Sequence, residues 1–285
     1  MNIILIFLIL ILSTEKKSQT EQHSCCSSPT AQFAMLSSDK TFEAAHLPPD
    51  SMKYEPKKGK FISFETGDSL KGRAFEVLGE SMSMKALTKK KVLLMIHEWW
   101  GLNDYIEREA ERMQEELGDV DILALDLYDG KIATTADDAG KYMQSVSEAR
   151  AKAIINGAIK YVGAKANVAT IGWCFGGGWS LQTALLANKQ AVGCVMFYGM
   201  PEKDSTKLAT LNCDVLGIFA KKDKWINPDV VSEFEKNMKQ ANKKLTVHSY
   251  DADHAFANPS NPHYDKEATS DAHKKVMEFL KTAFK

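Results

Sequence analysis

The sequence predicts an α/β protein with a mainly parallel central sheet and helices on both faces. From about residue 61 onward, short apolar runs alternate with longer segments of helical periodicity, the pattern of repeated strand–helix–strand units. Several of these runs, such as Lys91 to Ile96 (KVLLMI), are apolar throughout, as expected for strands buried on both faces. One such strand leads directly into a glycine-rich turn and a helix. These three observations define the fold class.

The predicted elements follow one another in a regular order. Two leading strands, 61–65 and 72–77, form a hairpin around Thr66-Gly67-Asp68. Further strands are predicted at 91–96, 120–127, 168–172, 191–197, 215–220 and 245–250. The helices between and after them are predicted at 104–117 (capped by Asn103 or Asp104), 136–164, about 178–188, 228–241 and 271–283. In such a sheet the functional site lies at the carboxyl ends of the strands.

The chain divides into three parts. Residues 61–285 are expected to form one catalytic domain, and residues 25–60, rich in Ser, Pro and Lys, a tail or linker. Residues 1–24 are predicted to be a signal or targeting segment, because Ile3 to Leu12 is an unbroken apolar run. That run is shorter than the roughly 20 residues that span a bilayer. We therefore expect export to the periplasm or outside the cell, with the cytoplasm as the alternative.

Two adjacent cysteines follow this segment. Cys25 and Cys26 raise the alternative of a lipoprotein, although Gln22 stands where a lipidation signal has an aliphatic residue. Membrane attachment is expected only through the N-terminus. Cys194 and Cys213 lie in or next to apolar runs and are expected to be core residues, so the five cysteines make a poor disulfide framework.

Composition excludes some classes of function. The formal net charge is −1, and Lys alternates with Asp and Glu along the chain, so no basic stripe for nucleic acid is present. The chain has only four arginines, which disfavours a site built from several arginine clamps. A small-molecule substrate is the expected partner, and the sequence does not indicate an oligomeric state.

The segment Gly172-Trp173-Cys174-Phe175-Gly176 has the form G-x-C-x-G, the thiol version of the nucleophile elbow of α/β-hydrolase folds. A sharp turn between strand and helix lifts the nucleophile above the sheet, and the glycines prevent a clash between the two elements. The helix N-terminus also points at the side chain and favours a thiolate. The alternative is a glycine-rich turn with a buried cysteine. The motif predicts Cys174 as a nucleophile.

A base and an acid follow in the chain order that this fold uses. Asp223 comes just after the strand 215–220, and His254 just after the strand 245–250. Asp251 and Asp253 are rivals for the acid, but they are close in sequence to His254. His97, at the end of the strand 91–96, competes with His254 as the base.

The segment His97-Glu98-Trp99-Trp100-Gly101 lies in the loop that donates an oxyanion-hole amide in this architecture. We assign the backbone N–H groups of Trp99 and Phe175 to that hole. Glu98 is a candidate for contact with the thiol. A metal site formed by His97-Glu98 and Asp253-His254 is disfavoured because no ligand pair has helical spacing. Tryptophans in the site loops, which either line an acyl pocket or pack the loops, are Trp99, Trp100, Trp173 and Trp225.

Together these residues resemble the dienelactone hydrolase family from about Phe61 to Lys285. The resemblance implies an α/β-hydrolase fold and a triad of Cys174, Asp223 and His254. It also implies that Glu98 pairs with the resting thiol and is displaced by substrate. One departure is that His254-Ala255-Phe256-Ala257-Asn258 contains no arginine, where the family holds the carboxylate of its substrate, and Asn258 stands in this place.

We therefore expect a hydrolase of carboxylic esters or lactones that works through an acyl-cysteine, without a metal or organic cofactor. Two alternatives stay open. A catalytically inactive binding protein on the same fold would have a broken triad, and a thioesterase would share the triad chemistry.

Overall fold

The computed structural model describes residues 29–49, 52–80 and 89–285. The predicted signal segment 1–24 and the cysteine pair Cys25 and Cys26 lie outside these residues. Across the three described ranges, no helix is both long enough and apolar enough to cross a membrane.

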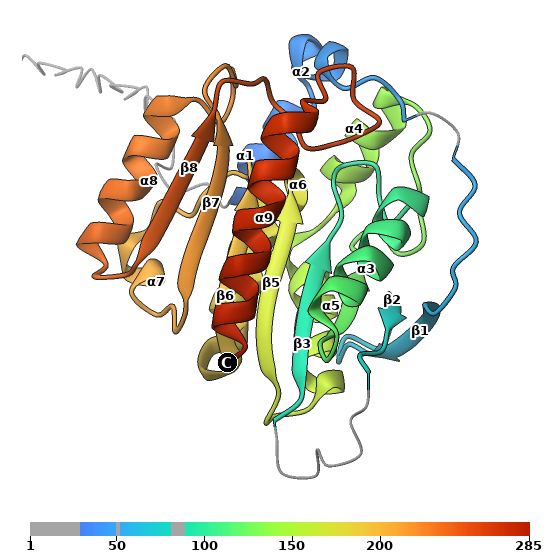
Figure 1. Ribbon diagram of the computed structural model, residues 1–285. Coiled ribbons are helices and arrows are strands. Elements are labelled where there is room, and N and C mark those ends of the chain that lie inside the picture. The colour runs from blue at the N-terminus through green and yellow to red at the C-terminus, as the bar shows by residue number, and fades with distance from the viewer. Residues whose placement is uncertain (1–28, 50–51, 81–88) are drawn as a thin grey trace, which may run out of the picture.

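The core of the fold is one eight-stranded sheet with the order β1-β2-β4-β3-β5-β6-β7-β8 (Figure 1). The first two strands form the predicted hairpin, β2 pairs antiparallel with β4, and all later pairs are parallel. The predicted fold class is confirmed. The strands are β1 (Lys60–Glu65), β2 (Lys71–Val77), β3 (Lys91–Ile96), β4 (Asp121–Leu125), β5 (Asn167–Trp173), β6 (Ala191–Phe197), β7 (Asp214–Ala220) and β8 (Leu245–Tyr250).

Helices cover both faces of the sheet. On the face toward the viewer in Figure 1, α3 packs on β4 while α9 packs on β6 and β7. On the other face, α5 packs on β1 and β2, and α6 packs on β3, β5 and β6. The remaining long helix, α8, lies beside β8 (Figure 1). The helices are α3 (Asp104–Leu117), α4 (Ala136–Ser145), α5 (Glu148–Val162), α6 (Phe175–Ala187), α7 (Ser205–Leu208), α8 (Pro228–Gln240) and α9 (Lys266–Ala283), with a 3₁₀ turn at Asn188–Gln190.

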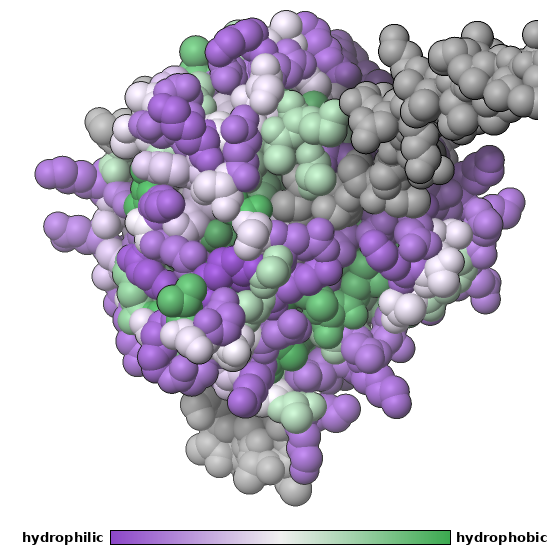
Figure 2. Space-filling view, turned by 180° about the vertical axis from the view of Figure 1, so that it is seen from behind, coloured by the Kyte–Doolittle hydropathy of each residue, from purple (hydrophilic) through white to green (hydrophobic). Residues whose placement is uncertain are grey.

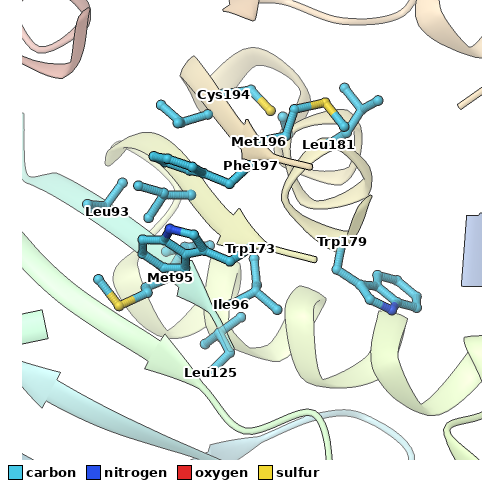
Figure 3. Packing of buried hydrophobic residues seen from close by; sticks show 14 of the residues in the cluster. Leu93, Met95, Ile96, Leu125, Trp173, Trp179, Leu181, Cys194, Met196 and Phe197 are labelled. Atoms are coloured by element: carbon cyan, nitrogen blue, oxygen red, sulfur yellow. The ribbon is translucent and has the colours of Figure 1, made fainter. Parts of the chain in front are cut away.

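Buried side chains fill the space between the sheet and these helices. Figure 3 shows Met95 and Ile96 of β3 beside Trp173 of β5 and Phe197 of β6, with Trp179 of α6 on the far side. The rings of Trp173 and Phe197 are stacked with centroids 5.6 Å apart. Seen from behind, hydrophilic residues occupy most of the surface, and hydrophobic residues form smaller groups between them (Figure 2).

Three helix boundaries differ from the prediction. The segment predicted as one helix from 136 to 164 is two helices, because Val146 is extended and Ser147 caps α5 by accepting the N–H of Arg150. α9 begins at Lys266 rather than near Asp271, since Asp265 caps it. α6 begins at Phe175 rather than near residue 178, because the chain turns at Cys174, whose φ is 53°, and the glycines 176–178 already belong to the helix.

The segment predicted as a tail contains two short helices, α1 (Pro29–Leu36) and α2 (Lys40–Ala45). Phe33 of α1 is buried and meets the ring of Phe175 edge-on, with centroids 6.5 Å apart. Phe42 of α2 is fully buried. Asp39 caps α2 by accepting the N–H of Thr41. Residues 29–46 therefore pack on the domain at the sheet edge where the functional site is expected (Figure 1).

Candidate active site

The predicted nucleophile stands on a strained turn between β5 and α6. Cys174 has φ 53° and ψ −116°, a conformation that costs a non-glycine residue roughly 1–3 kcal/mol. A Cβ on Gly172 would lie 2.1 Å from the carbonyl oxygen of Gly176, and a Cβ on Gly176 would lie 2.3 Å from that of Ile96. The two glycines thus let α6 approach β5 and β3 closely enough to form the elbow.

Replacement of Gly176 by alanine is expected to destabilise the fold by about 3 kcal/mol or more, because the new methyl group collides with the backbone of β3. Urea unfolding monitored by circular dichroism measures this loss. Gly140→Ala in α4 is the control: its methyl group would meet the nearest atom at 3.3 Å, and we expect a change below about 1 kcal/mol. Equal midpoints for the two variants would contradict the close-packing argument.

His254 lies between Cys174 and Asp223. Its Nε2 is 3.3 Å from the Cys174 sulfur, and its Nδ1 is 2.5 Å from Oδ2 of Asp223. The other oxygen, Oδ1, accepts the backbone N–H groups of Trp225 and Ile226, each at 2.9 Å. The loops that carry Asp223 and His254 leave the same edge of the sheet, since β7 and β8 are parallel neighbours. The sequence-predicted nucleophile, base and acid thus form a continuous chain of contacts.

The rivals for base and acid are engaged elsewhere. His97 accepts the N–H of Leu127 through Nε2 at 3.1 Å and donates from Nδ1 to the carbonyl oxygen of Glu98 at 2.5 Å. Both of its nitrogens are therefore used by the backbone. Asp251 and Asp253 form ion pairs with a lysine and a histidine at the surface. None of the three is placed to act on the sulfur.

Charges around the sulfur favour proton transfer to His254. Burial alone lowers the pKa of the His254 imidazole, but Asp223 and Cys174 outweigh it and raise that pKa well above its ordinary value. Burial raises the pKa of the Cys174 thiol; His254 opposes this rise, and the carboxylate of Glu98 adds to it. The thiol therefore resists ionisation in isolation, and a strong base stands beside it.

Glu98 is buried at the end of β3, with its oxygens toward two partners. Oε2 accepts from Nδ2 of Asn258 at 2.6 Å, and Oε1 accepts from the hydroxyl of Tyr198 at 3.4 Å. Burial raises the pKa of the Glu98 carboxyl to about 7, although His254 and both hydrogen bonds lower it. Glu98 thus acts on Cys174 through its charge, while its hydrogen bonds hold it against Asn258.

This buried carboxyl makes stability depend on pH. Its folded pKa of about 7 lies above the ordinary 4.5, so the folded state binds the proton more tightly, and stability falls as pH rises from 4.5 through 7. Glu98→Gln removes the charge and keeps an acceptor for Asn258. At pH 8 we expect the variant to be more stable than the parent by about 3 kcal/mol, with little difference at pH 4.5.

Chemical denaturation at the two pH values measures this difference. Glu235→Gln, at an exposed position of α8, is the control and should leave both values unchanged. A Glu98→Gln protein that is less stable than the parent at pH 8 would show that the buried charge does not carry the predicted cost.

A cavity of about 650 Å³ lies beside the site, between α3, α9 and the loop 257–260. Glu98, Asn258, Trp100 and Trp173 all contribute to its wall. Trp225 is placed differently: its ring packs edge-on against Phe42 with centroids 5.0 Å apart, and its Nε1 donates to Asp39 at 3.0 Å. Trp100, Trp173 and Asn258, all predicted near the substrate, therefore meet at one cavity, whereas Trp225 packs against α2.

A further imidazole, which sequence reasoning missed, lies next to His254. His46 directly follows α2 and is buried, with its ring centre 5.1 Å from that of His254 and 4.8 Å from the Trp99 ring. The segment was predicted as a tail because it lacks sustained periodicity. The one available signal was the capping residue Asp39, three positions before the apolar Phe42. It indicates where a helix begins but not where that helix packs on the domain.

The fold and this arrangement at the sheet edge define an α/β hydrolase. The chain belongs to the dienelactone hydrolase family, whose model matches residues 79–284, and it is a hydrolase that acts on ester or lactone bonds.

Individual relatives are similar over different lengths. Protein usf of Aquifex pyrophilus is 30% identical over 203 residues, which is 66% of this chain and 87% of that protein. The carboxymethylenebutenolidase of a Pseudomonas species is 31% identical over 115 residues, 40% of this chain and 47% of that enzyme. The crystal structure of a dienelactone hydrolase-like promiscuous phosphotriesterase from metagenomic libraries has a TM-score of 0.68 at 18% identity, covering 79% of this chain and 98% of that one.

Proposed function

We propose that the protein hydrolyses carboxylic esters or lactones through a triad of Cys174, His254 and Asp223 and an acyl-cysteine intermediate. The observation that carries this proposal is the continuous chain of contacts from the strained elbow sulfur through the imidazole to the buried carboxylate. The tautomer supports it as well. Because Nδ1 donates to Asp223, the lone pair of Nε2 faces the sulfur and can accept its proton.

Turnover then takes four steps. His254 accepts the Cys174 proton, and the thiolate attacks the substrate carbonyl. The backbone N–H groups of Trp99 and Phe175 hold the resulting oxyanion. This role for Phe175 is supported by its backbone N–H, which already donates to the Cys174 sulfur. The C–O bond breaks, and the alkoxide takes the proton from His254. Water, deprotonated by His254, attacks the thioester and releases the acid and the thiolate.

We propose that the rest of the substrate binds in the neighbouring cavity, because Glu98, whose charge acts on the Cys174 sulfur, is part of its wall. Trp100 and Trp173 contribute aromatic surface to its wall, and Glu98 with Asn258 contributes a hydrogen-bonded polar pair. A substrate with an apolar or aromatic acyl group fits this composition. A substrate group that displaces Glu98 would also remove the charge that raises the pKa of the Cys174 thiol, and would thereby activate the sulfur. Asn258 is neutral, so the position next to Glu98 offers a hydrogen bond rather than a positive charge, and the cations of the cavity wall come from other segments: Lys57, Arg108, Arg112 and Lys266.

A panel of p-nitrophenyl esters, lactones and acyl thioesters tests the proposal, with intact-protein mass spectrometry after rapid acid quenching. We expect ester turnover and an acyl adduct that maps to Cys174. Turnover of thioesters alone would favour the thioesterase alternative. An absence of turnover and of adduct with every substrate would favour a binding protein on the same fold.

We also propose that the protein is exported, on the evidence of the apolar run Ile3 to Leu12 followed by a polar stretch. Mass spectrometry of the protein purified from its native host would show a processed N-terminus, and any lipid on Cys25. A mature chain that retains residues 1–24 would contradict this proposal.

A further inference from the structure

Three electron-pair donors converge where α2 meets the catalytic elbow. One ligand atom each from His46, Cys174 and His254 lies within 4.8 Å of the other two, and all three residues are buried. His46 is contributed by the N-terminal segment, and the other two by the loops at the sheet edge. Of these three donors, hydrolysis as proposed above uses only Cys174 and His254, so His46 has no role in that reaction.

The hydrogen bonds of Nδ1 show that the lone pair of each imidazole, in His46 and in His254, is on Nε2. Nδ1 of His46 donates to the carbonyl oxygen of Phe42 at 2.7 Å, and Nδ1 of His254 donates to Asp223 at 2.5 Å. Each Nε2 is thereby left as an acceptor. Nε2 of His46 is buried and has no hydrogen-bond partner among the described residues. Two imidazole lone pairs and a sulfur thus share one thiol proton, which can satisfy only one of the acceptors.

We propose that His46, Cys174 and His254 form a site for a divalent zinc ion. Thiolate and imidazole are the ligands that zinc prefers, and a carboxylate or carbonyl behind each imidazole is the usual outer support of such ligands. In tetrahedral zinc the sulfur and nitrogen ligands lie about 3.6 Å apart. The Cys174 sulfur and Nε2 of His254 lie 3.3 Å apart, so these two donors would bind the ion with small shifts. The donor atom of His46 lies within 4.8 Å of the other two and would approach the ion by up to about 1 Å.

The surrounding charges favour a cation. Asp223 contacts His254 directly, and Glu98 acts on the sulfur through its charge. Binding releases the thiol proton, so a thiolate and Asp223 balance the two positive charges of the ion. Three protein ligands leave the fourth tetrahedral position to a water molecule. Because the ion occupies the sulfur and Nε2 of His254, zinc binding and ester hydrolysis exclude each other; this consequence rests on the function proposed above.

Zinc titration of the reduced full-length protein against a chelating indicator tests the site directly. We expect one ion per chain, and a Kd raised at least about tenfold by His46→Phe, which keeps a ring between Phe42 and Trp99 but removes the donor. Cys174→Ala should weaken binding at least as much. Cobalt substitution gives a second readout, a thiolate-to-metal charge-transfer band that Cys174→Ala abolishes.

Two controls match these variants. His248→Phe makes the same change on β8, outside the cluster, and the double variant Cys25→Ser/Cys26→Ser removes the two cysteines nearest to His46 in the sequence. Both should bind zinc like the parent. Thermal melting checks that His46→Phe is folded, and His46→Gln, which has a smaller polar side chain, should bind as weakly.

Zinc binding that survives in both folded His46 variants, or in Cys174→Ala, would overturn the inference. So would the absence of binding in the parent protein. These outcomes are independent of the function: an enzyme that forms an acyl-cysteine but binds no zinc keeps the function and loses the metal site. A protein whose zinc binding needs all three side chains, but whose ester turnover persists in Cys174→Ala, keeps the site and loses the function.

Discussion

Replacement of Cys174 by alanine is expected to lower kcat/KM for p-nitrophenyl acetate by at least about 10⁴-fold. The reason is geometric. The elbow presents this sulfur alone to Nε2 of His254, and the turn costs backbone strain that a buried structural cysteine would not need. Alanine at position 174 has the same backbone strain as cysteine, because both carry a Cβ. The loss of activity therefore reports the missing sulfur rather than unfolding. Initial rates and the acyl adduct in the mass spectrum are the two measurements.

Cys213→Ala is the matched control, since Cys213 is also a free cysteine but lies directly before β7. It should retain the parent activity and the adduct. A Cys174→Ala protein that keeps more than a tenth of the parent rate, or still forms the adduct, would show that another group performs the attack. The catalytic account would then fail even though the fold stands.

The fold, and the proximity of Cys174, His254 and Asp223, were predictable because each rests on local signals that the sheet topology then assembles. The KVLLMI run, the glycines around Cys174 and the apolar runs before Asp223 and His254 each identify a strand and its carboxyl end. A parallel sheet brings those ends to one edge. Chain positions 174, 223 and 254 are distant in sequence, yet their proximity follows once the strands are parallel neighbours.

The position of α2, which covers the site, was not predictable in this way. α2 has only six residues, and no periodicity can develop over so short a segment. Its position depends on the contacts of Phe42 with Trp99 and Trp225. These tryptophans lie far away in the sequence, in the loops after β3 and β7, so local patterns do not indicate the contacts. The break between α4 and α5 was not predicted for a related reason. Ser147 caps a helix only if the chain turns there, and the helical spacing of apolar residues continues across the break.

Asp223→Asn is expected to lower kcat/KM by about 10³–10⁴-fold while leaving the fold intact. Oδ1 of Asp223 accepts two backbone N–H groups, so the amide oxygen of asparagine will take that position and its NH₂ will face His254. Nδ1 of the imidazole must then accept a hydrogen bond instead of donating one. The ring proton moves to Nε2, where it points at the sulfur, and His254 can no longer accept the thiol proton. Loss of the carboxylate charge also lowers the pKa of His254.

The pH profile separates this effect from a structural one. In the parent, the raised His254 pKa belongs to the coupled pair with Cys174, and removal of the Asp223 charge should shift the limb of the kcat/KM profile that reports this pair. Asp251→Asn, at an exposed position of the loop that carries His254, should change neither the rate nor the profile. If Asp223→Asn melts like the parent and retains activity within tenfold, the carboxylate does not orient the base, and His254 must hold its tautomer through other contacts.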